Sequence, residues 1–132
     1  MPTLITDAER NADADRAAEQ IKYLSVHTAS TELTGTAEAT GGDPPYARKP
    51  VTFNAAGTAG PLGETLQPAT VGVAWSSQAV FDVAAGTYTH WGAWDTLTGG
   101  VFKRGNDLST VQNPTGQSVF ALSIGVGPYS GV

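Results

Sequence analysis

The segment "IKYLSVHT", residues 21–28, marks the point where the hydrophobic period of the chain changes from helical to extended. Side chains alternate along it, so that Ile21 and Tyr23 share one face while Leu24 and Val26 share the other. A strand with apolar side chains on both faces is typical of a sandwich interior or of a subunit contact. The segment therefore predicts the first strand of a β-domain.

The residues before this strand predict a helix from about 7 to 20. Thr6 followed by Glu9 matches a capping box, in which a hydroxyl and a carboxylate satisfy free amide groups of the first turn. Alanines dominate the rest of the segment and favour helix. Because alanine buries little apolar area, we expect this helix to lie on the outside of the domain or against another subunit.

Short extended segments follow the first strand, and glycine-containing turns separate them. "AAGT" (84–87) and "DTLTGG" (95–100) are typical of hairpin loops. This spacing predicts a mainly β fold, a jelly-roll-like β-sandwich with one N-terminal helix, as a single domain over residues 1–132. The tail 127–132 is expected to be flexible or bound by a partner. The predicted strands are 50–53, 71–75, 79–83, 87–94, 100–105 and 118–126, with long loops at 29–49 and 54–70.

The composition narrows the classes of function. Charged residues make up 14% of the chain and the net charge is -5, whereas phosphate binding needs clustered lysine and arginine. Cysteine is absent, which removes disulfides and thiolate zinc sites. No apolar run approaches the ~20 residues of a membrane span. We therefore expect a protein made in a cytoplasm, with no cofactor, no metal, and no nucleic-acid or membrane partner.

His27 and His90 are the only histidines of the chain. With Asp82 or Asp95 they would form a 2-His-1-carboxylate metal set if the strands brought them together. Each histidine also stands beside a threonine in a predicted strand, so we prefer a structural role as hydrogen-bonding groups in a ladder. Asp95 precedes "TLTGG" and is expected to cap a turn. Carboxylate pairs for glycoside cleavage could be drawn from Asp43, Glu64, Asp82 and Asp95, but the pattern does not favour an enzyme.

Aromatic residues gather in one predicted strand. Trp91 and Trp94 have opposite parity there, so one of them faces solvent or a partner if the other faces the core. Tryptophan is enriched at interface hot spots and also stacks on sugar rings, and we favour core or interface packing. Arg48 follows a double proline that fixes its position. Its guanidinium is expected to bind a carboxylate or backbone carbonyls, either inside the domain or across a subunit boundary.

Three stretches occur in a fixed order: "YLSVHTAS" (23–30), "GGDPPYARKPVTF" (41–53) and "GTYTHWGAWDTLTGGVF" (86–102). Together they resemble a family of small bacteriophage virion proteins, the tail-fibre-like or minor tail proteins of phages of actinobacteria. The resemblance covers roughly residues 20 to 104. It is carried in the second and third stretches by Tyr46, Ala47, Arg48, Thr89, His90, Gly92, Trp94, Asp95, Gly99 and Gly100.

The resemblance implies a non-enzymatic structural component of a virion, assembled in the cytoplasm of a host bacterium through contacts with other virion proteins. A tail-fibre or minor tail position follows from the family, whereas capsid decoration would suit a small acidic domain. The alternative from another class is a carbohydrate-binding module that recognises a bacterial surface glycan, with an exposed tryptophan as its stacking platform.

The sequence also predicts self-association. Low charge content, the alanine face of the helix and the two-faced strand at 21–28 leave surface to be covered, and soluble monomers seldom expose large apolar patches. Repeating virion positions favour closed symmetric assemblies, so we expect a homo-oligomer, with a trimer as the preferred form. The interface or packing candidates are Tyr46, Arg48, Trp91, Trp94 and Tyr129.

Overall fold

The structure is a computed structural model that describes residues 5–127. The chain divides into two compact units. The helical unit contains residues 5–20, 52–78 and 123–127, and the sandwich unit contains Ile21–Val51 and Ala79–Leu122. The mainly β fold with one N-terminal helix is confirmed. That all 132 residues form a single domain stays a prediction.

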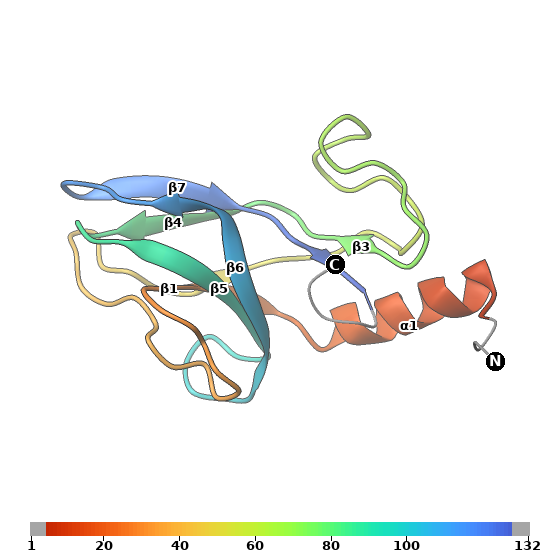
Figure 1. The fold of residues 1–132 in the computed structure, drawn as a ribbon, viewed down its shortest axis with the longest axis horizontal. Coiled ribbons are helices and arrows are strands. Elements are labelled where there is room, and N and C mark those ends of the chain that lie inside the picture. Colours follow the sequence, from red (N-terminus) through yellow and green to blue (C-terminus); the bar gives the residue numbers. More distant parts are fainter. Residues whose placement is uncertain (1–4, 128–132) are drawn as a thin grey trace. The chain divides into compact units, whose positions relative to one another are not determined.

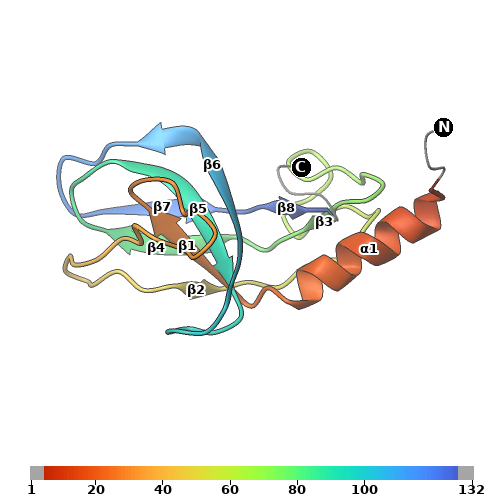
Figure 2. The same cartoon turned by 60° about the horizontal axis from the view of Figure 1, so that its bottom comes forward.

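The helical unit is built around α1 (Asp7–Glu19), with β3 (Ala74–Trp75) and β8 (Gly125–Val126) paired antiparallel. Figure 1 labels α1 and β3, and Figure 2 also labels β8. The Thr6 hydroxyl accepts a hydrogen bond from the Glu9 N–H at 3.2 Å, which is the hydroxyl half of the predicted capping box. In the described part of the chain, no helix has the length and apolar character that crossing a bilayer requires.

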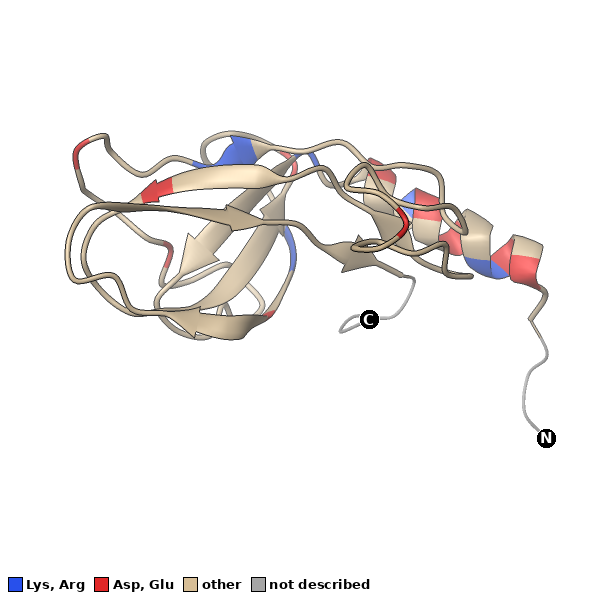
Figure 3. Ribbon diagram, turned by 90° about the horizontal axis from the view of Figure 1, so that it is seen from above, with Lys and Arg blue, Asp and Glu red and all other residues tan. Residues whose placement is uncertain are grey.

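The alanine face of α1 packs within its own unit, where Ala14 and Ala18 meet Ala56 and Ala74. The expectation that this helix lies on the outside of the domain or against another subunit stays a prediction. Small side chains let the neighbouring loops approach closely enough to bond the helix. The Asp15 carboxylate accepts a hydrogen bond from the Ala56 N–H at 2.8 Å, and Asn11 accepts one from Gly72 at 2.8 Å. Acidic and basic residues lie along α1 (Figure 3).

The sandwich unit contains two sheets. The first has four strands in the order β2-β1-β5-β6, and the second pairs β4 with β7. Figures 1 and 2 show β4 and β7 side by side. Phe81 is fully buried and stacks on Phe120 and on Tyr46, whose hydroxyl accepts a hydrogen bond from Val26 of β1. The strands are β1 (Tyr23–His27), β2 (Lys49–Pro50), β4 (Ala79–Val83), β5 (Tyr88–Trp94), β6 (Phe102–Gln112) and β7 (Ser118–Leu122).

Of the two predicted hairpin loops, one is confirmed and one is wrong. Residues 95–100 join β5 to β6, which pair antiparallel. Residues 84–87 do not form a hairpin, because β4 pairs with β7 and β5 lies in the other sheet. The link carries the chain from one sheet to the other, and Gly86 donates its N–H to the Pro114 carbonyl at 3.1 Å. A turn sequence predicts where the chain reverses direction, but it does not predict which strand each neighbouring strand pairs with.

Several further boundaries differ from the prediction: the predicted strands 50–53 and 71–75 are reduced to β2 (Lys49–Pro50) and β3 (Ala74–Trp75). The predicted strand 118–126 is interrupted between β7 and β8, where the Ile124 N–H donates to the Ser76 hydroxyl at 2.9 Å. The predicted strand 100–105 continues to Gln112 as β6. The continuation is rich in polar residues and lacks an apolar alternation that would have marked it.

Candidate functional site

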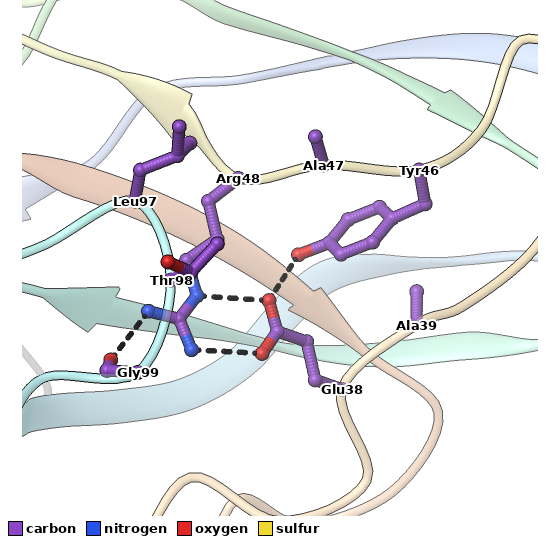
Figure 4. Close-up of a pocket in the computed structure, with 8 residues that line it drawn as sticks. All are labelled: Glu38, Ala39, Tyr46, Ala47, Arg48, Leu97, Thr98 and Gly99. Atoms are coloured by element: carbon purple, nitrogen blue, oxygen red, sulfur yellow. Dashed lines mark hydrogen bonds and ion pairs between the residues drawn. The ribbon is translucent and has the colours of Figure 1, made fainter.

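Arg48 forms the centre of a polar cluster in the sandwich unit. Its Nε donates to Glu38 Oε2 at 3.0 Å and its Nη2 donates to Glu38 Oε1 at 3.1 Å, a two-pronged contact (Figure 4). Its Nη1 donates to the carbonyls of Thr96 and Gly99 at 3.0 and 2.9 Å. Charge-assisted bidentate bonds of this kind are stronger and more directional than neutral ones. One guanidinium therefore joins a carboxylate from the 28–40 loop to the β5–β6 hairpin loop.

The Arg48 guanidinium also lies over the Trp94 ring, 3.5 Å from its centroid. Arg48 is only 8% exposed, and cation–π attraction is largest where the cation is desolvated. Trp94 is itself buried and meets Phe102 edge to face at 5.2 Å between centroids. One face of Trp94 is thus covered by a side chain of its own unit.

Tyr46 completes the cluster. Its hydroxyl donates to Glu38 Oε2 at 2.9 Å and accepts from the Val26 N–H at 3.1 Å. Burial raises the pKa of the Tyr46 phenol well above its usual range, and the Glu38 carboxylate adds to this rise. The residues on either side of Glu38 are bonded to β1 and to the residue that follows it. The Thr28 N–H donates to the Ala37 carbonyl, and the Ala39 N–H donates to the Val26 carbonyl.

A cavity of about 400 Å³ opens beside the cluster. Its charged groups are one carboxylate and one guanidinium, which neutralise each other. Apolar walls come from the alanines and from Leu97. The arrangement ties three loop segments together, and its polar groups are bonded mainly to one another. The lining residues are Glu38, Ala39, Tyr46, Ala47, Arg48, Leu97, Thr98 and Gly99 (Figure 4).

His27 lies fully buried at the end of β1, in a chain of hydrogen bonds. Its Nδ1 is 2.7 Å from the Thr36 carbonyl, which can only accept, so Nδ1 carries the proton. Its Nε2 then accepts from the Ser25 hydroxyl at 2.6 Å, and that hydroxyl accepts from the Trp94 indole N–H at 2.8 Å. Burial lowers the pKa of His27, against the smaller opposing effects of the Thr36 carbonyl and Glu38.

His90 faces His27 in the β1–β5 pairing but has different partners. Its Nε2 lies 2.7 Å from Asp107 Oδ1, and its Nδ1 lies 2.7 Å from the Thr89 hydroxyl. Asp95 accepts a hydrogen bond from the Val101 N–H at 2.9 Å within the hairpin loop. The structure therefore does not assemble the two histidines with a carboxylate as a metal set. Across residues 5–127, no three His, Cys, Asp or Glu side chains are grouped to hold a metal ion.

The remaining sequence candidates are dispersed. Trp91 is half-buried on β5, opposite Val26, and Tyr129 lies outside the described residues. The sequence did not single out Glu38, because it stands in a Thr- and Gly-rich loop without periodicity. Glu38 would have been found only by asking which carboxylate of the loop lies near the edge of the first predicted strand. Ser25 and Thr36 carry no signal either.

The family model described as Podophage GP4 fiber I protein gp80 matches residues 7–126. No curated protein matches the chain. The family match runs from the first residue of α1 to the last residue of β8, so it includes the Arg48 cluster and both histidines. Because it covers most of the sequence, the chain belongs to the phage fibre family of podophage GP4 fiber I protein gp80.

Proposed function

We propose that this chain is a non-enzymatic structural subunit of a phage tail, built into a tail fibre or into the minor tail proteins beside it. One observation carries the proposal: the fibre-family match over residues 7–126. Membership of that family makes the chain a structural component of a virion. The position in the tail, rather than on the capsid surface, is the further step.

The geometry supports an assembly role. Arg48, Glu38 and Tyr46 bond one another and backbone groups, so they hold loops in place and leave no activated nucleophile among them. Nucleophilic catalysis would require a nucleophile with a base and an orienting group. The stretches that resemble tail proteins of actinobacterial phages contain Tyr46, Arg48 and Trp94, which meet in this cluster. We therefore extend the proposal to a tail protein of a phage of actinobacteria.

The glycan-binding alternative rests on Trp91. A sugar ring could stack on the covered face of Trp94 only if Arg48 moved away from it. Trp91 is half-buried, so the platform it offers is small. A glycan array probed with the full chain and with Trp91→Ala measures this alternative directly. Binding that disappears in the variant would favour it.

Immunogold labelling of purified particles tests the tail position. Antibody raised against the full chain is expected to label the tail or its fibres. Label on the capsid surface would contradict the tail position, and absence of the chain from purified particles would contradict the virion role. Mass spectrometry of the same particles checks that the antibody detects this chain.

We also propose that the chain associates with other virion proteins and with copies of itself after synthesis in the host cytoplasm. The support is the exposed apolar residues of the sandwich unit, among them Val80, Val101 and Val119. The trimer expected from the sequence stays a prediction, and light scattering of the full chain measures the number of copies.

A further inference from the structure

β7 has one free edge. It pairs with β4 and, within residues 5–127, with no other strand. The backbone hydrogen bonds outside the β4 pairing involve no residue from 118 to 122. An antiparallel strand directs its N–H and C=O groups alternately to its two sides, so part of the β7 backbone has no partner among residues 5–127.

This edge carries none of the features that usually block pairing with another chain. The strand "SVFAL" contains no charged residue, proline or glycine, and its register with β4 runs without a shift. Natural edge strands are commonly protected by charges, bulges or prolines. β6, at the edge of the other sheet, is protected in this way: it carries Lys103, Arg104 and Asp107, and its register with β5 shifts twice.

The side chains beside the free edge are apolar and exposed. Along β4 and β7, one set of alternate side chains faces the core, including the fully buried Phe81. The other set points outward, and in it Val80 is 46% exposed and Val119 is 64% exposed. Ala121, which pairs with Val80, is also exposed. An unpaired backbone edge and an apolar outer face thus occur on the same strand.

We propose that β7 pairs antiparallel with β7 of a second copy, which joins two β4–β7 pairs into one four-stranded sheet. This names the contact for the self-association proposed above and rests on it. A strand paired antiparallel with itself satisfies a two-fold axis, so the same edge serves both copies. Val119 and Ala121 of the two copies then become cross-strand neighbours on the outer face. A two-fold contact predicts an even number of copies, in contrast to the trimer expected from the sequence.

The charges of the two strands permit this pairing. Asp82 is the only charged residue on β4 and β7. In the joined sheet, the two β4 strands are separated by three strand spacings, ~14 Å. That separation exceeds the Debye length of ~8 Å at physiological ionic strength, so the two Asp82 carboxylates repel only weakly. A partner of opposite charge is not required, which favours a second copy over a basic peptide.

The test measures the mass of the full chain by light scattering over a range of concentrations. The wild-type chain is expected to double in mass as its concentration rises. Val119→Lys places a charge beside the edge of each copy and should raise the dissociation constant about tenfold or more, since like charges brought together cost several kcal/mol. Leu33→Lys is the matched control. Leu33 is 93% exposed and lies in a loop away from β7, so this variant should leave association unchanged.

Val80→Lys separates edge pairing from packing of the outer face. Val80 lies on β4, one strand away from the new contact, so its replacement should weaken association less than Val119→Lys does. Equal loss in both variants would indicate face packing and overturn the proposal. A monomer at every concentration up to about 1 mM, or a mass that triples instead of doubling, would also overturn it.

Amide hydrogen exchange supplies a second readout on the unmodified chain. The amides of β7 should become protected as concentration rises, while those of β6 should not change. Association without new protection in β7 would contradict the edge contact even if every variant misfolded. The particle-labelling experiment is independent of this result: a chain absent from virions could still dimerise through β7, and a labelled tail protein could fail to do so.

Discussion

The two units bury polar groups of different kinds. In the sandwich unit a guanidinium and an imidazole are buried, those of Arg48 and His27, and the guanidinium bonds the half-buried carboxylate of Glu38. In the helical unit the buried polar side chains, Gln67 and Ser76, are uncharged. Gln67 donates to the Ser76 carbonyl at 2.8 Å and accepts from the Leu62 N–H at 2.9 Å, both inside the same unit.

This difference predicts which substitutions and which pH changes should destabilise each unit. A buried charge that loses its partner costs far more than a neutral group that loses one hydrogen bond, because its desolvation is no longer compensated. Neutral amides and hydroxyls also keep their protonation state across ordinary pH. We therefore expect the sandwich unit to be the more sensitive to single substitutions of its polar residues and to pH. Hydrogen exchange, which resolves the two units by their peptides, tests this comparison.

The largest effect is expected from Glu38→Ala. The change leaves the 8% exposed Arg48 guanidinium without its carboxylate, and removing one partner of a buried ion pair costs about 3 kcal/mol or more. Glu38 is itself 23% exposed, so water can enter and the loss should lie near the low end of that scale. Urea unfolding measures the free energy, and hydrogen exchange should show the loss in the peptides around 28–40 and 95–100.

Two variants bracket this result. Glu38→Gln keeps the size of the side chain and one acceptor oxygen, and should therefore lose less than Glu38→Ala. Glu19→Ala removes an exposed carboxylate of α1 and should change stability by less than about 0.5 kcal/mol. A loss of similar small size for Glu38→Ala would mean that the cluster is no more than a surface ion pair.

Gly92→Ala should produce the next largest effect, through the His27 chain. A Cβ at this position would lie 2.5 Å from the Ser25 hydroxyl oxygen and 2.7 Å from His27 Nε2. Both atoms are buried and hydrogen-bonded, so they cannot withdraw without breaking their bonds. Overpacking of this kind costs about 1–3 kcal/mol, measured by urea unfolding. Gly116→Ala is the control, because a Cβ there meets nothing within 4 Å.

How far the sequence predicted these features depends on their range along the chain. β1, β4 and β5 were found because alternating apolar residues mark strands directly. Arg48 was singled out because it follows the double proline Pro44–Pro45, and that the prolines fix its position stays a prediction. Its partner Glu38 was not found, because an aperiodic loop carries no signal for the contact it will make after folding.

Pairing between strands was also beyond the local pattern. The "AAGT" turn signal predicts a reversal, and β4 instead found its partner in β7, where Phe81 lies opposite Phe120. The polar cluster depends on several such distant contacts at once. The residue types indicated which side chains required partners, and only the three-dimensional arrangement determined which partners they found.

Gln67→Ala should have a smaller effect than either change in the sandwich unit, and one confined to the helical unit. It leaves the Leu62 N–H and the Ser76 carbonyl without their partner, and unsatisfied neutral groups cost about 1–2 kcal/mol. No titratable group takes part, so the loss should be the same at about pH 7.5 and about pH 5. Exchange should accelerate in peptides from residues 52–78 alone. A loss that grows at low pH would contradict the assignment of a neutral network to this unit.

The smallest effect expected is the pH dependence that His27 gives to the sandwich unit. Burial lowers the pKa of His27 in the folded chain below its ordinary value of about 6.5. Thr36 and Glu38 raise this pKa by smaller amounts, and His90 and Arg48 lower it further. The unfolded chain therefore takes up the proton first as pH falls. The stabilisation is complete above about pH 6.5 and is lost as pH falls toward the folded pKa, below which both states are protonated. Protonation would also convert Nε2 into a donor facing Ser25, whose hydroxyl already donates to it.

Urea unfolding at about pH 7.5 and about pH 5 measures this loss, and His27→Gln should reduce it because the amide does not titrate. His90→Gln is the matched control, since it removes the other histidine from the facing strand. Both histidines lie in the sandwich unit. After correction for intrinsic exchange rates, amide protection should therefore fall more between these two pH values in the sandwich unit than in the helical unit. Equal pH dependence in the wild-type chain and in His27→Gln would remove His27 as the source.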